Sequence, residues 1–427
     1  MLRGCKMMQA ENIDKYQRKD LINWRIHLLV FMIAFAIVIS RRPDALLNAQ
    51  FWAEDGRVWY AEAYRLGVMP SLFTLHTGYF QTASRLTAGI GQFFPFIWAP
   101  LIFNLTAILI MILPVNLLVS SRFALLIPNF YHRLFVGALY LALPNSYEVH
   151  ANITNSHWYL AILACMVILA TSSTILTWQI FDVGIIVLSA LSGPFSIMLV
   201  PIATIIWFVR RKKFLLMLLA FLYIGALVQA LAIYNGRHQI SLGATPALFT
   251  KITGQLFLGA LLGQQGLEWL KVHFWGYKLL LMLTAILGIT AFLYSFVKAP
   301  LELQMFNCFA TLVFFASLLS PVESGTIPAW LSLSMTGFGC RYWLIPMLSF
   351  IVLLIWLLSK KQPRLLRIAA AFTLSMMVFG IPLDWRHPAF VNLEFKTYAN
   401  KFTTAPQGAK MMIPINPPGW FMELTKH

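Results

Sequence analysis

Charge is scarce in this sequence, and acidic charge most of all. Only 11% of the 427 residues are charged, and 15 acidic residues stand against 32 lysines and arginines. A soluble domain carries about 25% charged residues, so this shortage argues against a soluble globular protein. Apolar residues make up 59% of the chain, and several uninterrupted runs reach the roughly 20 residues with which a helix crosses a hydrocarbon core. The sequence therefore predicts an all-α, polytopic membrane protein.

Cysteine is also scarce, and the four cysteines form no CxxC motif and no paired framework. This pattern supports neither a structural zinc site nor a disulfide scaffold. An Asp-x-Asp motif is missing as well. His150 and His157 could bind a divalent metal together with a carboxylate, but their spacing matches no defined ligand pattern. We therefore predict no cofactor, with a divalent metal as an alternative that lacks a ligand motif.

Basic residues dominate the charge, and the formal net charge is +17. In a soluble protein this excess would suggest nucleic acid as the partner. Here the basic residues lie in short clusters between apolar runs, which positive-inside topology and anionic lipid head groups explain more simply. We therefore expect membrane lipids as partners and no nucleic acid. Two clusters mark the cytoplasmic side: Lys15, Arg18, Lys19 and Arg25 before the first apolar run, and Arg210, Arg211, Lys212 and Lys213 near the middle of the chain.

These markers orient about eleven predicted spans, with the N-terminus in the cytoplasm and the C-terminus on the outer side of the membrane. We divide the chain into a cytoplasmic segment (1–24), a transmembrane domain (25–383) and an outer C-terminal tail (384–427). The predicted spans run at about 25–40, 98–119, 134–143, 159–177, 182–192, 194–210, 214–234, 277–297, 302–320, 342–358 and 365–383.

Three segments outside these spans have a predicted structure of their own. The long first outer loop, residues 41–97, contains an amphipathic helix around 58–66 that is expected to lie on the membrane surface. The segment 249–262 is apolar but rich in glycine, and it is predicted as a re-entrant or surface helix. In the tail, the prolines of residues 413–420 favour an extended strand or a turn over a helix.

The acidic residues gather on the predicted outer side, and none interrupts the middle of a predicted span, where a proton-coupled transporter would be expected to bury one. Glu54 and Asp55 stand out in the stretch Phe51-Trp52-Ala53-Glu54-Asp55-Gly56. They are either a base or metal ligand at the membrane surface or a hydrated pair at the N-terminus of the next helix. The flanking aromatic residues place the pair at the lipid interface, where a base would meet a lipid-borne substrate, and this favours a functional role.

A second group of polar residues lies in the outer turn that follows the third predicted span. It could form a hydrogen-bonding wall for a sugar, with Trp158 as a stacking surface, or it could be a hydrated turn with an interfacial tryptophan. The group consists of Tyr147, Glu148, His150, Asn152, Asn155, His157 and Trp158.

A third group is cationic and suits a phosphate head group, which arginine can bind with two hydrogen bonds. Arg341 is the strongest candidate because it opens a span beside Gly337 and Gly339, where backbone can approach a ligand closely. Arg85 lies on the same outer loop as Asp55, and Arg237 lies in a later outer segment. Each of these arginines is otherwise an interfacial anchor. Tyr79 and Tyr342, on the segments of Arg85 and Arg341, are further candidates for substrate binding.

These features together resemble the GT-C class of glycosyltransferases, polytopic enzymes that use polyprenyl-phosphate-linked sugars. The likeness rests on a first span followed by a large outer loop with an acidic motif, here Glu54-Asp55, on many further spans and on polar loops at the outer face. It is greatest for uncharacterised bacterial members in which a Trp-Ala-Glu-Asp-Gly motif, an Arg-Tyr-aromatic span start and a proline-rich tail occur together.

The resemblance implies inverting transfer of a sugar from a polyprenyl-phosphate donor to a glycan or lipid acceptor of the cell envelope at the periplasmic face. Asp55, assisted or replaced by Glu54, would act as general base, and Arg341 and Arg85, together with Arg237, would stabilise the leaving phosphate. Two alternatives stay open: a transporter or flippase for a lipid-linked saccharide, and a polymerase or ligase of surface polysaccharide.

Overall fold

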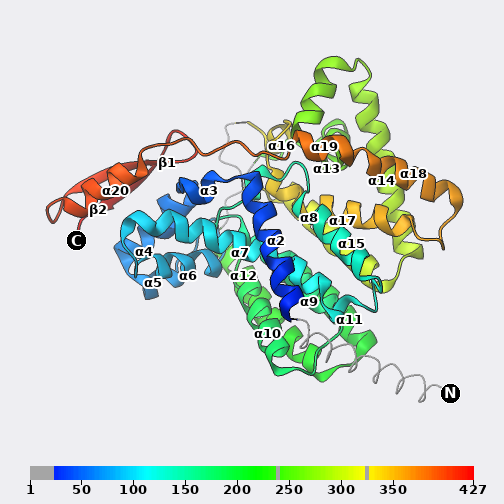
Figure 1. The fold of residues 1–427 in the computed structure, drawn as a ribbon, viewed down its shortest axis with the longest axis horizontal. Helices are drawn as coiled ribbons and strands as arrows, with labels where there is room; N and C mark the ends of the chain where they lie inside the picture. Colours follow the sequence, from blue (N-terminus) through cyan, green and yellow to red (C-terminus); the bar gives the residue numbers. More distant parts are fainter. Residues whose placement is uncertain (1–23, 237–240, 323–326) are drawn as a thin grey trace.

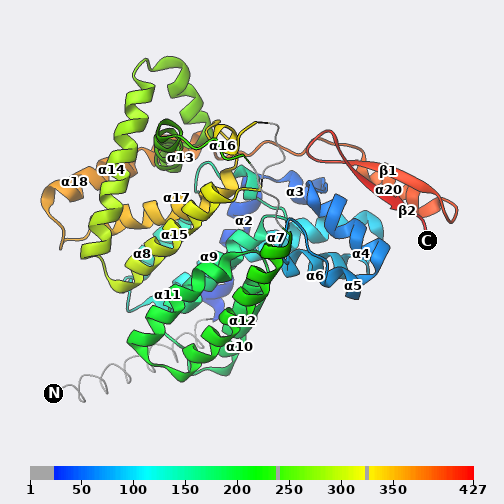
Figure 2. The same cartoon turned by 180° about the vertical axis from the view of Figure 1, so that it is seen from behind.

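The computed structural model describes residues 24–236, 241–322 and 327–427, and they are mostly helical (Figures 1 and 2). In this part of the chain, seven helical segments are long and apolar enough to cross a membrane. Their presence confirms a polytopic helical membrane protein. The seven are α2 (Trp24–Arg41), α7 with its preceding turn (Phe96–Val119), α12 (Lys213–Gly236), α14 (Tyr277–Lys298), α15 (Leu301–Leu319), α17 (Cys340–Leu357) and the consecutive helices α18 and α19 (Arg364–Leu383).

Four further predicted spans are helices, but shorter ones. They contain 12 to 16 residues, which is about 18–24 Å at 1.5 Å per residue, against a hydrocarbon core of about 30 Å. The total of about eleven spans therefore stays a prediction, as does the side on which each terminus lies. The four are α8 (Phe130–Leu141), α9 (Ser156–Leu169), α10 (Leu176–Ala190) and α11 (Phe195–Arg210).

The first outer loop folds into a lobe of short helices. The helix predicted around 58–66 exists as a π-helical turn, η1, followed by α4, but its apolar residues Trp59, Tyr60 and Ala63 are buried inside the protein. The most exposed apolar side chains of the lobe lie instead at the end of α3, on and just after α5, and after α6: Leu47, Met69, Phe73 and Phe93. The elements are α3 (Asp44–Leu47), η1 (Asp55–Tyr60), α4 (Ala61–Leu66), α5 (Val68–Leu72) and α6 (Thr82–Gly91).

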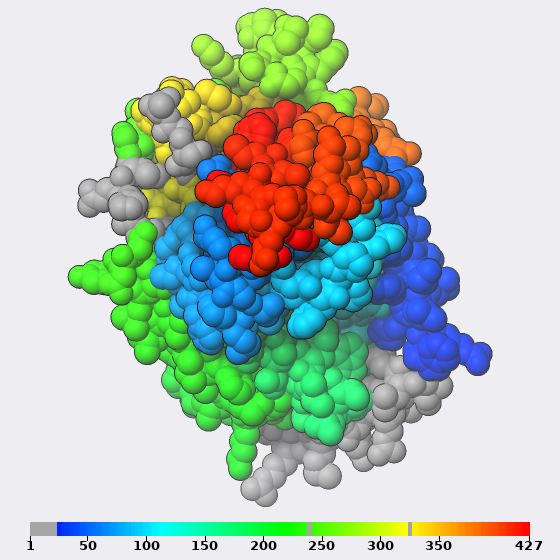
Figure 3. Space-filling view, turned by 90° about the vertical axis from the view of Figure 1, so that its left-hand side faces the viewer, coloured from blue at the N-terminus to red at the C-terminus, as the bar shows by residue number. Residues whose placement is uncertain are grey.

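The tail covers this lobe, as the red segment in front of the blue one shows in Figure 3. It contains α20 (Phe395–Thr404) and an antiparallel hairpin of β1 (Lys410–Ile415) and β2 (Trp420–Thr425), in which Ile415 lies opposite Trp420. Strand β2 contacts η1 and α4, and α20 contacts the turn before α7. The extended structure predicted near 413–420 is confirmed, while α20 was not predicted and the hairpin departs from an all-α fold.

The glycine-rich segment 249–262 forms the first half of α13 (Pro246–His273), which bends at Gly263 with φ of 72°. This first half is largely buried and packs against α14 and α19, so the surface-helix alternative is wrong. The bend leaves backbone N–H groups without helical partners, and Asp384 accepts hydrogen bonds from those of Gln264 (2.6 Å) and Gln265 (3.0 Å). The carboxylate thereby caps the second half of the helix, where the helix dipole favours negative charge.

Candidate functional site

Asp55 lies at the start of η1 with its side chain wholly buried. One carboxylate oxygen accepts hydrogen bonds from the backbone N–H of Thr154 (2.8 Å) and from its hydroxyl (2.6 Å), and the other accepts one from the N–H of Ile153 (3.2 Å). Burial raises the pKa of Asp55 to about 7, although these hydrogen bonds act in the opposite direction. Asp55 therefore joins the first outer loop to the polar turn before α9.

The backbone around Asp55 is fixed from the other side by the tail. The N–H of Ala53 donates to the carbonyl of Asn416, and the N–H of Asn416 donates to the carbonyl of Phe51 at 3.0 Å. Gly56 follows because there is little room for a side chain: a Cβ atom there would stand 3.1 Å from the Phe51 side chain. The loop thus runs between two segments distant in sequence, and its conformation is set by both.

Glu54 is the other half of the acidic pair, and its side chain is only partly buried. It makes no hydrogen bond or ion pair with any other residue that the structure describes. Burial raises the pKa of Glu54, and the charge of Glu148 adds to the rise, while Arg341 and Arg57 lower it. Glu54 is therefore a partly exposed carboxylate with a raised pKa, on which the charges of Arg341 and Glu148 act.

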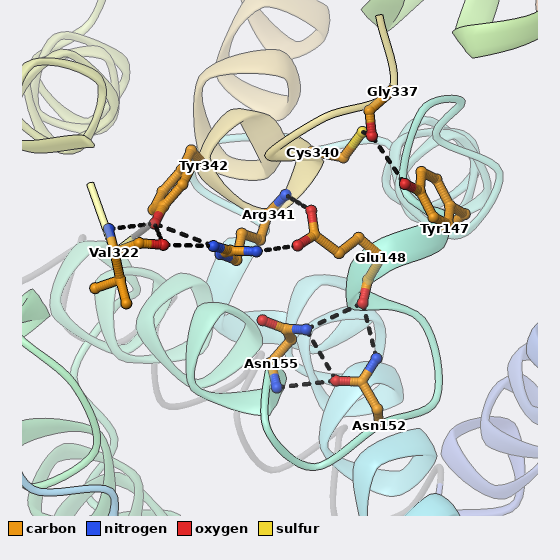
Figure 4. A network of polar contacts seen from close by, with 9 residues as sticks. All are labelled: Tyr147, Glu148, Asn152, Asn155, Val322, Gly337, Cys340, Arg341 and Tyr342. Carbon is orange, nitrogen blue, oxygen red and sulfur yellow. Dashed lines mark hydrogen bonds and ion pairs between the residues drawn. The ribbon is translucent and has the colours of Figure 1, made fainter. Parts of the chain in front are cut away.

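Arg341 and Glu148, whose charges act on Glu54, form an ion pair with each other (Figure 4). The Glu148 carboxylate accepts a hydrogen bond from the backbone N–H of Arg341 (3.0 Å) and another from its guanidinium Nη1. The Arg341 Nη2 donates to the carbonyl of Val322 (2.9 Å) and to the hydroxyl of Tyr342 (3.3 Å). The arginine side chain is 27% exposed and that of Glu148 13%. The positive charge at the start of α17 is thus accessible and held in place.

One loop connects the two halves of the site. The side-chain amides of Asn152 and Asn155 donate to the backbone carbonyl of Glu148, at 2.8 and 3.0 Å. The next residues along, Ile153 and Thr154, bind Asp55. The segment 148–155 therefore contacts the acidic pair of the first outer loop at one end and the cation of α17 at the other.

The predicted sugar-binding wall is inside the protein. His150, Asn155, His157 and Trp158 are all buried. His150 Nε2 lies 3.0 Å from the carbonyl of Val38, and burial together with the nearby arginines lowers the pKa of His150 well below its usual range. Trp158 packs edge-on against the rings of Phe195 and Tyr342. These residues build the loop and support Tyr342, and none presents a surface to a ligand in this conformation.

Arg85 is buried within the first outer loop. It forms a 2.8 Å ion pair with Glu62 and stacks over the ring of Trp59, whose Nε1 donates to the Thr154 hydroxyl at 2.9 Å. Tyr79 is also buried, and its backbone pairs with that of His76. Arg237 lies outside the described residues. Of the two described arginines predicted to bind phosphate, Arg341 is the one whose charge acts on Glu54.

Three residues that support the site were missed as such from sequence. Glu148 was placed in the polar turn but not linked to Arg341, and neither Thr154 nor Asn416 was chosen as a candidate. Their partners are distant along the chain, 193 residues in the case of Glu148 and Arg341 and 99 in the case of Thr154 and Asp55. Only the scarcity of acidic residues in this chain could have singled out Glu148.

Metal binding has no evident centre in the part of the chain that the structure covers, where no three histidine, cysteine or acidic side chains come together. Comparison of the chain with known protein families and with curated proteins finds no match.

Proposed function

We propose that the protein is a membrane glycosyltransferase that moves a sugar from a polyprenyl-phosphate donor to a glycan or lipid acceptor of the cell envelope. The observation that carries the proposal is that the charge of an accessible arginine, Arg341, acts on a partly exposed carboxylate, Glu54. Such transfer needs a base at the acceptor hydroxyl and a cation at the leaving phosphate.

In this proposal Glu54 takes the proton of the acceptor hydroxyl. The hydroxyl oxygen then attacks the anomeric carbon of the sugar, and the bond from that carbon to the phosphate oxygen breaks with inversion. Arg341 stabilises the negative charge that develops on the departing prenyl phosphate.

The geometry favours Glu54 over Asp55 as the base. Both oxygens of Asp55 accept hydrogen bonds inside the protein, and no part of its side chain is exposed, so an acceptor hydroxyl has no path to it. Asp55 instead fixes the backbone that presents Glu54. A base is also more effective when its pKa lies near the working pH, and burial moves the pKa of Glu54 in that direction.

The membrane arrangement belongs to the same proposal: about eleven spans in a bacterial inner membrane, with the site at the periplasmic face. Exposed basic residues at the turn between α11 and α12, Arg211, Lys212 and Lys213, support a cytoplasmic position for that turn. Glu54 and Glu148 lie in turns outside the long helices, and Arg341 lies in the first turn of α17. The turn of Glu148 precedes α9, whereas Arg210, next to the basic turn, donates to the carbonyls of Leu169 and Ala170 at the other end of α9.

The experiment that tests the proposal uses the full-length protein in vesicles that contain a polyprenyl-phosphate sugar with a labelled sugar. Transfer releases free polyprenyl phosphate and moves the label to a glycan fraction. A flippase would move the intact lipid between leaflets without breaking the bond, and a polymerase or ligase would transfer chains of several sugars. Appearance of label in an acceptor as a single added sugar supports the proposal, and translocation without cleavage contradicts it.

A further inference from the structure

We propose that Glu148 is a positioning residue of this site, which holds Arg341 in the orientation that receives the donor phosphate. This inference rests on the proposed function, because it assigns a role in the same site. The Glu148 carboxylate accepts two hydrogen bonds from Arg341: one from its backbone N–H at 3.0 Å and one from its guanidinium Nη1.

The first of these contacts fixes the start of α17. Arg341 is the second residue of the helix, and its N–H has no partner within the helix. Glu148 accepts that N–H and places negative charge at the positive end of the helix dipole. The backbone from which the arginine side chain departs is therefore fixed by Glu148.

The second contact fixes the side chain. A carboxylate on Nη1, together with the Val322 carbonyl and the Tyr342 hydroxyl on Nη2, holds the guanidinium plane from two edges. Tyr342 is itself packed against Trp158. An arginine side chain loses much rotational freedom when it binds a ligand, and that loss is already made in this arrangement.

The exposure of the two side chains indicates whether Glu148 supports Arg341 or competes with the donor phosphate for it. If Glu148 competed with the donor for Arg341, it would have to lie in front of the guanidinium. The carboxylate is instead the less exposed partner, 13% against 27% for the arginine, and its own backbone is held in the loop by Asn152 and Asn155. A phosphate that approaches from solvent therefore meets the cation before the carboxylate.

The charge of Glu148 also acts on Glu54. The charged groups that face Glu54 are Arg341 and Arg57, which lower its pKa, and Glu148, which raises it, while Asp55 is its neighbour in the chain. Removal of the Glu148 charge should lower the pKa of Glu54, and removal of Arg341 should raise it. The two substitutions therefore shift the acidic limb of the pH–rate profile in opposite directions, which a purely structural role of Glu148 would not do.

The test compares Glu148→Gln, Glu148→Asp and Arg341→Gln in the transfer assay. Glu268→Gln is the matched control because the Glu268 side chain is 43% exposed and forms an ion pair with Lys271 at 3.3 Å. A glutamine oxygen can accept one of the two hydrogen bonds, so Glu148→Gln should raise KM for the donor about tenfold with a smaller change in kcat. Its acidic limb should move to lower pH, and that of Arg341→Gln to higher pH. Glu148→Asp keeps the charge and should raise KM without moving the limb.

A lower KM in Glu148→Gln would show a competing carboxylate and overturn the proposal, and so would unchanged kinetics with an unmoved limb. A second readout separates this inference from the proposed function: binding of farnesyl phosphate, followed by the fluorescence of tryptophans near the site, which needs no glycosyl transfer. About tenfold weaker binding in Glu148→Gln with normal binding in Glu268→Gln supports the positioning role even if wild-type protein transfers no sugar. Equal binding by wild type and Glu148→Gln contradicts it.

Discussion

Two arginine–carboxylate pairs lie near opposite ends of α9, and they differ in how far their side chains are exposed to solvent. Arg122 and Asp182 form two hydrogen bonds at 2.7 and 2.8 Å, with both side chains 1% exposed and the guanidinium stacked over Trp178. Arg341 and Glu148 are joined through a backbone and a side-chain contact and are open to solvent. The helix between them, with 14 residues, is about 21 Å long.

The difference separates two uses of the same chemistry. A sealed pair satisfies all its own hydrogen bonds and offers nothing to a ligand, so it can only fix how the helices pack. An open pair costs less to break and leaves part of the arginine accessible. We therefore assign the Arg122–Asp182 pair to stability and the Arg341–Glu148 pair to binding and catalysis, and the following predictions test that division in order of expected effect.

The largest effect is expected for Arg122→Met. Removal of one partner leaves a buried, unpaired carboxylate at Asp182, which typically costs about 3–5 kcal/mol of unfolding free energy. Thermal unfolding in detergent should show a marked fall in the transition temperature. The double variant Arg122→Met/Asp182→Leu should recover much of the loss, since no buried charge is then left unpaired. Normal stability of the single variant would contradict the assignment of the Arg122–Asp182 pair to stability.

Arg341→Met is expected to lower the transfer rate by about 10²–10³, the usual effect of deleting one group that stabilises a developing negative charge. Its transition temperature should fall less than that of Arg122→Met, because Glu148 can be hydrated once it is alone. Arg341→Lys keeps the charge but loses the planar guanidinium, so its transfer rate should lie between those of the wild type and Arg341→Met. If Arg341→Met unfolds as readily as Arg122→Met, the division between the two pairs is wrong.

Asp55→Asn should destabilise the protein by about 1–3 kcal/mol, because an amide cannot accept from all three donors at this buried position. The size of the effect should depend on pH. The pKa of folded Asp55 is raised from 3.8 to about 7, so the folded state holds the proton more tightly than the unfolded chain. The stability contributed by Asp55 is therefore full below pH 3.8 and falls as the pH rises through about 7.

The measurement is the difference in transition temperature between wild type and Asp55→Asn across that pH range. It should be larger at the acidic end than above the raised pKa of Asp55. A difference that grows with pH would mean that the folded protein stabilises the ionised form of Asp55. The pKa of Asp55 would then be lowered on folding, which contradicts the prediction.

Asn416→Ala should give the smallest effect. The folded tail should lose about 1 kcal/mol of stability, because the substitution removes two neutral hydrogen bonds between the Asn416 side chain and the backbone of Val391. The tail contacts the first outer loop through Asn416, at Phe51 and Ala53, next to Glu54. We therefore expect a measurable loss of transfer activity together with faster proteolysis of residues 384–427, while the transition of the helical body stays unchanged. Unchanged proteolysis and activity would indicate that the tail does not fix the Glu54 loop.

The sequence predicts well those features that repeat locally. Long apolar runs mark α2, α7, α12 and α14 because a membrane helix must satisfy its backbone hydrogen bonds within itself and cover itself with apolar side chains. The span predicted from about 342, beside Gly337 and Gly339, corresponds to α17. The helix begins at Cys340, directly after Gly339, which takes a φ of 64°.

The division of labour inside the acidic pair could not be predicted. Glu54 and Asp55 are chemically alike and adjacent, and only the fold directs one side chain to Thr154 and leaves the other accessible. The same holds for His150 and Trp158, whose polarity suggests a surface but whose burial depends on packing against Val38, Phe195 and Tyr342. Contacts between segments this far apart in sequence leave no local pattern in a single chain.

The central claim is that Glu54, and not Asp55, is the base beside Arg341. The most direct measurement is the single-turnover rate of sugar transfer by Glu54→Gln and Asp55→Asn, each with its thermal transition. We predict that Glu54→Gln is slower by about 10²–10⁴ with the transition of the wild type, whereas Asp55→Asn unfolds at lower temperature and keeps a larger share of its activity while folded. Normal transfer by Glu54→Gln, with activity lost in a stable Asp55→Asn, would contradict the account.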